Sequence, residues 1–245
     1  MAINYGVAFT VNNVTYHSKD DYNLIMTNKQ ISTPVPETHY VEVPGRNGAI
    51  DMSDIITGTT KFKPRTITLS FFSPKHVTEW ELEATTIRNQ ICGRSCSIVF
   101  DDDLAFKWIG RVTSVECAYE GRNETIQIVA EVDPFKRNIT SSAEPWLWDP
   151  FDFDLGIINE TADVPISGSG TITITASQQW TNPTVSVTAD MTMVFRNSAN
   201  ETTTKTLYAA DGSVVLYDCI IKEGDNTFTF TGTGSVTINY VGGML

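Results

Sequence analysis

Apolar and polar residues alternate along much of the chain, and this period is typical of half-buried β-strands. In the first half it is clearest at 65–72, where Ile67, Leu69 and Phe71 fall on one face, and it recurs at 124–132. Further strands are predicted at 7–11, 14–16, 22–26, 39–43, 97–100, 106–112 and 114–119. The first two of these form a predicted hairpin with an Asn12-Asn13 turn.

One stretch of the first half changes to a helical period. Its apolar residues recur at steps of three and four: Val77, Trp80, Ala84, Ile87 and Ile91. The predicted start is Ser73-Pro74, or alternatively a capping box from Thr78 to Glu81, and Gly93 is the predicted end. The apolar stripe is expected to pack on a sheet rather than to form a partner-binding groove, because the opposite face is polar (Glu79, Glu83 and Arg88).

The pattern changes again after 133–137, where a Pro-containing and then aromatic segment begins. Beyond it no helical period is visible, and short strands recur with turn residues between them. They are predicted at 171–175, 184–188, 192–196, 204–208, 213–217, 227–230 and 235–240. Residues 168–174 and 232–238 read alike, and we expect them to be neighbours in one sheet.

These patterns predict a mainly β protein with two domains. Residues 1–137 are expected to form an α+β domain with one helix on an antiparallel sheet. Residues 138–160 read as a linker or docking segment, and residues 161–245 as a β-sandwich or jelly roll.

Charge narrows the classes of partner. The chain has 245 residues with 17 Lys and Arg against 29 Asp and Glu, a net charge of −12. Of this, −3 falls in 1–137 and −9 in 138–245. Such a surface argues against sequence-specific nucleic-acid binding through phosphate contacts, although DNA passing through a pore without being held remains compatible with it. No secretory signal and no membrane-spanning run of 18 apolar residues is visible, so no membrane insertion is expected.

Chemistry-bearing motifs are sparse. Cys92 and Cys96 have no second Cys or His pair to complete a zinc site, so all four cysteines are expected as free thiols. The acidic run 101–103 lacks the rest of a calcium loop and is interpreted as a solvated turn. The three histidines lie in unrelated segments, and no catalytic motif is present. We therefore expect no enzyme activity, no metal and no cofactor.

One aromatic and acidic segment suits sugar binding. Rings stack on pyranose faces, and carboxylates accept hydroxyl hydrogen bonds. The candidate glycan contacts are Trp146, Trp148, Asp149, Asp152 and Asp154. The same pattern also suits a strand that docks one domain on the other.

The segment 43–53, with the sequence V-P-G-R-N-G-A-I-D-M-S, stands out from the rest of the chain. Pro44-Gly45 predicts a type II turn, and Asn47-Gly48 predicts a type I′ turn. Arg46 lies between the two turns. This combination predicts a rigid, protruding corner.

This segment, followed by the strand R-T-I-T-L-S-F at 65–71, resembles the signature of the distal tail protein (Dit) family of siphophages. The order of parts agrees: an N-terminal hairpin, the loop, a strand, one helix, a hairpin pair and D-P-F-K-R at 133–137. The resemblance covers about 1–137. The second half is similar only in kind to the galectin-like or carbohydrate-module-like β-sandwich of that family.

The resemblance implies a structural virion protein at the tail tip, assembled in the host cytoplasm. Family members form a homohexameric ring, the baseplate hub, whose first domain surrounds a DNA-conducting channel. The implied partners are the tail tube protein, the tail-associated tip protein, and in some phages tape measure and receptor-binding proteins. The loop residues carried over as ring or neighbour contacts are Pro44, Gly45, Arg46, Asn47, Gly48 and Asp51. The second domain shows no long insertion that would grip receptor-binding proteins, which favours a simple hub.

Two other readings stay open. The second half alone suits a carbohydrate-binding module or an adhesin acting in host-surface recognition. A cell-wall hydrolase is the third reading, and no local motif supports it. The hub is favoured because it alone gives the first domain a role.

Overall fold

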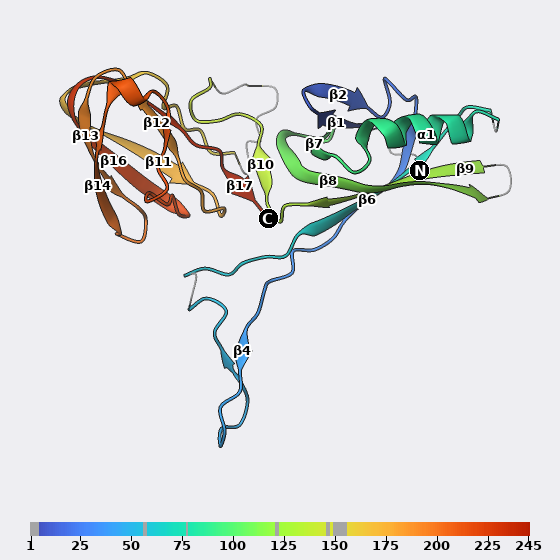
Figure 1. The fold of residues 1–245 in the computed structure, drawn as a ribbon, viewed down its shortest axis with the longest axis horizontal. Coiled ribbons are helices and arrows are strands. Elements are labelled where there is room, and N and C mark those ends of the chain that lie inside the picture. Colours follow the sequence, from blue (N-terminus) through green and yellow to red (C-terminus); the bar gives the residue numbers. More distant parts are fainter. Residues whose placement is uncertain (1–4, 56–57, 77, 121–122, 146–147, 149–155) are drawn as a thin grey trace. The chain divides into compact units, whose positions relative to one another are not determined.

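The computed structural model describes residues 5–55, 58–76, 78–120, 123–145, 148 and 156–245. The chain folds into two compact units (Figure 1). Unit 1 comprises 1–102 and 108–134, and unit 2 comprises 103–107 and 135–245. Strands dominate both units, and the described residues contain a single α-helix. The predicted fold class, mainly β with antiparallel sheets, is confirmed.

Unit 1 is built on a sheet in the order β2-β1-β7-β8-β9-β6-β3. Its pairs β1–β2, β1–β7, β8–β9, β6–β9 and β3–β6 are antiparallel. The strands are β1 (Val7–Val11), β2 (Val14–His17), β3 (Ile25–Ile31), β6 (Arg65–Phe72), β7 (Ser95–Phe100), β8 (Asp103–Glu120) and β9 (Asn123–Val132). The predicted Asn12-Asn13 turn joins the first two, and both asparagines have positive φ (50° and 64°).

Helix α1 (Trp80–Ile91) covers the core of unit 1 with the predicted stripe, of which Trp80, Ala84, Ile87 and Ile91 are buried. Val77 lies outside the described residues. The helix ends as predicted: Gly93 has φ +72°, and its amide donates to Val112 O over 2.8 Å. Both predicted starts are wrong, because Glu79 is the N-cap residue and no side chain caps the helix.

Two long strands replace pairs of shorter predicted ones. β8 runs through Thr113, where a bulge between Val112 and Ser114 absorbs one residue without ending the strand. In unit 2, β16 (Gly224–Asn239) runs through Gly232 and Gly234. Their φ values of +148° and +156° let the strand bend while pairing continues. β3 also begins later than predicted, because Asn23 with φ +56° keeps the preceding residues in a turn.

The remaining part of unit 1 is a hairpin between β3 and β6, residues 32–64, here named the arm (Figure 1). Within the arm two short strands pair with each other, β4 (Tyr40–Val41) and β5 (Ile50–Asp51). The predicted strand 39–43 is thus observed in part. Near its base, the Glu37 amide donates to Lys61 O over 2.8 Å. No described residue from 32 to 64 is buried.

Unit 2 is a second antiparallel sheet in the order β14-β13-β16-β12-β15, and β11 also pairs with β16, from Gly224 to Val236. Gly168 pairs with Gly232, so the two similar segments are neighbours in one sheet, as predicted. A small ladder joins β10 to β17 and to the first residues of β8. The elements are β10 (Lys136–Asn138), β11 (Val164–Ala176), β12 (Thr184–Val187), β13 (Met191–Arg196), β14 (Thr202–Leu207), the 3-10 helix η1 (Ala209–Asp211), β15 (Val214–Val215), β16 and β17 (Gly243–Met244).

Each unit has its own hydrophobic core. Phe9, Phe71 and Phe100 are among the largest fully buried side chains of unit 1, and Phe195, Phe228 and Phe230 among those of unit 2. Among the described residues, no helix has the length and apolar character needed to span a membrane.

Candidate functional site

The tip of the arm is a tight corner made by Pro44 and Gly45. Gly45 has φ +83°, and the Arg46 amide donates to Val43 O over 3.1 Å, as a type II turn requires. The predicted type I′ turn at Asn47-Gly48 is wrong, because only Gly48 has positive φ (+80°) and a type I′ turn needs it at both residues. Residues 43–49 are all exposed.

Just behind this corner, hydrogen bonds connect Asp51, Ser53 and His39, a cluster here named the Asp51–Ser53 lock. Asp51 Oδ1 accepts hydrogen bonds from both the amide and the hydroxyl of Ser53, and the His39 amide donates to Ser53 Oγ over 2.9 Å. The Ser53 hydroxyl and then its amide hold the pKa of Asp51 below its usual value. The carboxylate of Asp51, a predicted contact residue, therefore orients the Ser53 side chain, and the Ser53 hydroxyl joins the two sides of the arm through the His39 amide.

Apolar side chains of the arm face solvent along its length. The exposed large ones are Val35, Tyr40, Val41, Val43 and Ile55, of which Ile55 is 66% exposed. A two-stranded hairpin without a core is at best marginally stable by itself in water. Exposed apolar surface on such an element is typical of a segment that another surface covers.

A second surface feature of unit 1 is a groove between α1 and the β1–β2 hairpin, here named the α1 groove. Its volume is about 540 Å³. Two apolar residues on its rim are strongly exposed, Leu82 at 71% and Val14 at 50%. The lining residues are Val14, Thr15, Tyr16, Asp21, Tyr22, Lys75, Glu79, Leu82, Glu83, Thr86 and Gln90.

Polar contacts fix the walls of the α1 groove. Glu83, predicted on the solvent face, is buried instead, because its carboxylate is held on both oxygens. Ser73 Oγ donates to Oε2 over 2.6 Å, and Lys75 Nζ lies 2.7 Å from Oε1. Across the groove, the Tyr22 hydroxyl donates to Gln90 Oε1 over 2.6 Å. Burial raises the pKa of Tyr22, so this hydroxyl stays protonated and keeps its role as a donor.

The acidic run 101–103 begins with an exposed turn at Asp101 and Asp102, as predicted, but its carboxylates are paired within the protein. Each carboxylate has its own cationic or histidine partner: His17 lies beside Asp101, Lys29 beside Asp102 and Lys136 beside Asp103. Lys29 also lies over the Phe100 ring, 3.9 Å from its centroid. The run is therefore a structural junction rather than a cation site, and the described residues contain no group of three His, Cys, Asp or Glu side chains placed to hold a metal ion.

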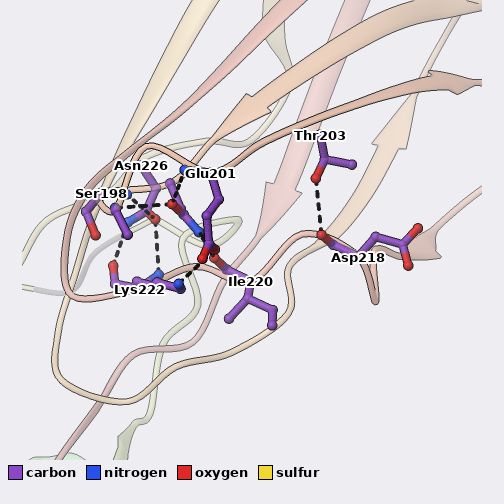
Figure 2. Close-up of polar contacts among 9 residues, drawn as sticks. Ser198, Glu201, Thr203, Asp218, Ile220, Lys222 and Asn226 are labelled. Atoms are coloured by element: carbon purple, nitrogen blue, oxygen red, sulfur yellow. Dashed lines mark hydrogen bonds and ion pairs between the residues drawn. The ribbon is translucent and has the colours of Figure 1, made fainter. Parts of the chain in front are cut away.

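In unit 2 a polar cluster joins the loop 197–201 to residues 218–226, which end at the start of β16 (Figure 2). Asn226, fully buried, accepts at Oδ1 from the Ser198 and Lys222 amides. Its Nδ2 donates to the Lys222 and Gly224 carbonyls over 2.7 and 2.8 Å. The polar atoms of this side chain are thus used within the protein, so the cluster holds loops in place.

Glu201 closes the same cluster from its exposed side. Lys222 Nζ lies 2.7 Å from its Oε2, which also accepts from Asn197 Nδ2 over 2.7 Å. These two partners, Lys222 first, hold the pKa of Glu201 below its usual value. Lys222 in turn lies 4.6 Å from the Trp180 ring centroid, so the cation covers this ring.

Comparisons with known proteins place the whole chain in one fold. No family model and no curated protein sequence matches it. Among solved structures it matches the crystal structure of SPP1 Dit (gp 19.1), with a TM-score of 0.59 at 12% identity. The match covers 98% of this chain and 99% of the other. The chain has the distal tail protein fold. The resemblance predicted from the sequence is therefore confirmed at the level of the fold.

The structure of SPP1 Dit is described as a paradigm of the hub adsorption apparatus of phages that infect Gram-positive hosts. In the present chain, which has the same distal-tail fold, the predicted loop residues 44–48 and 51 come together at one end of the arm. Of the predicted glycan contacts, Trp146, Asp149, Asp152 and Asp154 lie outside the described residues. Trp148 is described and is 68% exposed.

The α1 groove was missed by reasoning from the sequence. The helical period identified the buried stripe of α1 but gave no reason to look at Leu82, which lies off that stripe. The one available signal was the isolated leucine on an otherwise polar face, and a single exposed apolar residue is common on protein surfaces. Only the packing of the β1–β2 hairpin beside α1 turns it into the rim of a groove.

Proposed function

We propose that this protein is the hub at the distal end of a siphophage tail, a structural virion protein without enzymatic activity. Six copies form a ring through unit 1, and the arm is the contact between neighbours. The ring joins the tail tube to the tip proteins around a channel for DNA. The fold likeness to a hub protein along the whole chain supports this role.

The single observation that carries the proposal is the arm. It contains no buried residue among those described, and it exposes five large apolar side chains. An element of this kind needs a partner surface, and subunit contacts in a ring provide one for every copy. The rigid Pro44–Gly45 corner loses little conformational entropy on docking.

The net charge of the first 137 residues is compatible with a channel that conducts DNA. Residues 1–137 carry a net charge of only −3, and the chain as a whole carries −12. A weakly acidic ring repels a passing polyanion slightly and does not hold it, so DNA moves through without being retained.

The deciding experiment is the mass of the purified protein by light scattering, with negative-stain images of the same fraction. We expect a ring of six times 27.1 kDa with a central hole. The measurement is repeated with the tail tube protein added, because this partner stabilises the ring by mass action. A 27.1 kDa species under both conditions contradicts the hub.

A second role is proposed for unit 2, binding of host-surface glycans, and the exposed indole of Trp148 favours it. The test is a glycan array probed with the full chain and with Trp148→Ala. Binding that is lost in the variant supports glycan recognition at this residue, and absence of binding by the unmodified chain rejects it.

A further inference from the structure

We propose that the arm tip of one copy docks in the α1 groove of the next copy. In this contact the Arg46 guanidinium meets the Glu79 carboxylate, and the apolar corner at Val43 and Pro44 covers Leu82 and Val14. The inference rests on the proposed ring and identifies the surface that receives the arm.

The charges of the two surfaces are complementary. Within the α1 groove, Lys75 neutralises Glu83. Asp21 accepts a hydrogen bond from the His17 amide, but among the described residues neither Asp21 nor Glu79 has a cationic partner. Glu79 makes no side-chain hydrogen bond as the N-cap of α1. On the arm tip, Arg46 is the one charged residue in 43–50. The positively charged tip of the arm is therefore complementary to the α1 groove, whose lining has two more carboxylates than cationic side chains.

The apolar parts match as well. The rim of the α1 groove exposes Leu82 and Val14, at 71% and 50%. The corner before Arg46 consists of Val43, which is 40% exposed, and the exposed Pro44. Docking removes all four side chains from water, and this burial supplies the non-directional part of the attraction. A volume of about 540 Å³ lies within the range of ligand pockets and admits a tight turn with one long side chain.

The geometry of the two elements favours docking. The polar walls of the α1 groove are held by Glu83 with Ser73 and by Tyr22 with Gln90. The arm tip is held by its Val43–Arg46 hydrogen bond and by the Asp51–Ser53 lock. Two preorganised surfaces lose less freedom on association than mobile ones do.

The contact is heterologous, because the arm and the α1 groove are different surfaces of one unit. Such head-to-tail contacts generate a ring when the rotation between copies closes. Each copy then offers one arm and receives one, so all arms in the ring are covered.

The test is a charge exchange in the full chain, read as ring mass by light scattering. Arg46→Glu and Glu79→Arg each place like charges together, and we expect each to abolish the ring. The double variant restores the attraction with reversed sign, and we expect the ring to return. Because both residues are exposed, the thermal unfolding of the monomer, measured at low concentration, is expected to change little in all three proteins.

Two matched controls carry the same charge changes elsewhere. Lys63→Glu alters an exposed lysine at the arm base, and Glu81→Arg alters an exposed glutamate of α1 outside the α1 groove. Both are expected to leave the ring intact. If the ring persists in Arg46→Glu and in Glu79→Arg, the docking inference is overturned while the hub proposal stands.

A cross-linking measurement covers the case in which the unmodified chain forms no ring. Asn47→Cys and Leu82→Cys proteins are mixed at high concentration with a bifunctional maleimide. A dimer that forms in the mixture and in neither protein alone supports the contact. Its absence overturns the contact, independently of the ring.

Discussion

The Nε2 atom of His17 lies 3.0 Å from Oδ1 of Asp101, so the end of β2 is joined to the turn after β7. The other oxygen of Asp101 accepts from the Gly6 amide over 2.7 Å. On the far side of the imidazole, Nδ1 lies 3.2 Å from the Asp20 carboxylate. The imidazole thus lies between two carboxylates, one on each ring nitrogen.

The first prediction concerns pH. Burial disfavours the charged form of Asp101, but the hydrogen bonds from His17 and Gly6 outweigh it and lower its pKa below 3.8. A carboxyl with a depressed folded-state pKa stabilises the protein above its unfolded pKa, and this contribution is lost as pH falls through the folded value. Asp101→Asn is therefore expected to lower the free energy of unfolding at pH 7 by about 0.5–1 kcal/mol, because the pair is partly exposed.

The measurement is urea unfolding of the Asp101→Asn variant and the unmodified chain across pH. The difference between them is expected to shrink below pH 3.8, where the unfolded carboxyl is already protonated. Asp20→Asn, which removes the more exposed partner of His17, is the control and is expected to have the smaller effect. A difference that stays the same as pH falls well below 3.8 contradicts the assignment.

The second prediction concerns Asn226, the buried centre of the loop cluster in unit 2 (Figure 2). Asn226→Leu leaves the Ser198 and Lys222 amides and two carbonyls without this partner. Because buried polar groups without partners cost about 1–3 kcal/mol each, we expect a loss of roughly 3 kcal/mol or more.

Urea unfolding followed by circular dichroism checks this loss, since unit 2 has its own hydrophobic core. Asn239→Leu, at the exposed end of the same strand, is the matched control and is expected to change stability by less than about 0.5 kcal/mol. Equal effects of the two substitutions would rule out the cluster as a determinant of stability.

The elements that the sequence predicted well are those in which one local signal decides. The alternation at 65–72 gives β6 at the predicted bounds, and the helical stripe gives the buried face of α1. Gly93 ends the helix because its positive φ is a local property of glycine. In each case the neighbouring residues alone carry the information.

The errors have non-local causes. The sequence predicts Glu83 as a surface residue. Its burial is possible because Ser73 and Lys75, which lie beside it in the turn before α1, contact its two carboxylate oxygens and offset the loss of hydration. The sequence predicts β8 and β16 each as two shorter strands. In the structure both are continuous, because pairing with the long strands β9 and β11 continues through a bulge in β8 and through a glycine pair in β16. The α1 groove requires two elements separated in sequence, so no local pattern predicts it.

A third prediction follows from the close approach of β8 and β9 at Gly110. A Cβ atom added there would lie 2.2 Å from Glu131 O and 2.6 Å from Val132 Cα, both backbone atoms that cannot rotate away. Gly110→Ala is therefore expected to cost about 1–3 kcal/mol, as overpacking in a rigid site does. Gly170→Ala is the matched control, because the closest atom there is the flexible Cδ1 of Ile166 at 2.7 Å.

Thermal unfolding of the two alanine variants compares these sites. The Gly110→Ala variant is expected to unfold at a clearly lower temperature, whereas the Gly170→Ala variant adjusts by a rotamer change of Ile166. Equal melting temperatures would contradict the prediction, because they would mean that β8 and β9 move apart to accept the added methyl group at little cost.

The last prediction separates folding from assembly in the arm. Tyr40 and Val41 are 61% and 49% exposed, and neither belongs to the core of unit 1. Tyr40→Ser and Val41→Ser therefore remove little buried area within one copy, and the melting temperature of the monomer is expected to stay the same. In the ring the same side chains are covered, so each substitution is expected to shift the equilibrium toward monomer, as seen by light scattering over a dilution series.

Val194→Ser, at a residue of unit 2 that is 37% exposed, is the control and is expected to change neither the melting temperature nor the equilibrium between ring and monomer. A ring unaffected by both arm substitutions would mean that the arm stays exposed after assembly, and the contact between copies would then lie on another surface of unit 1.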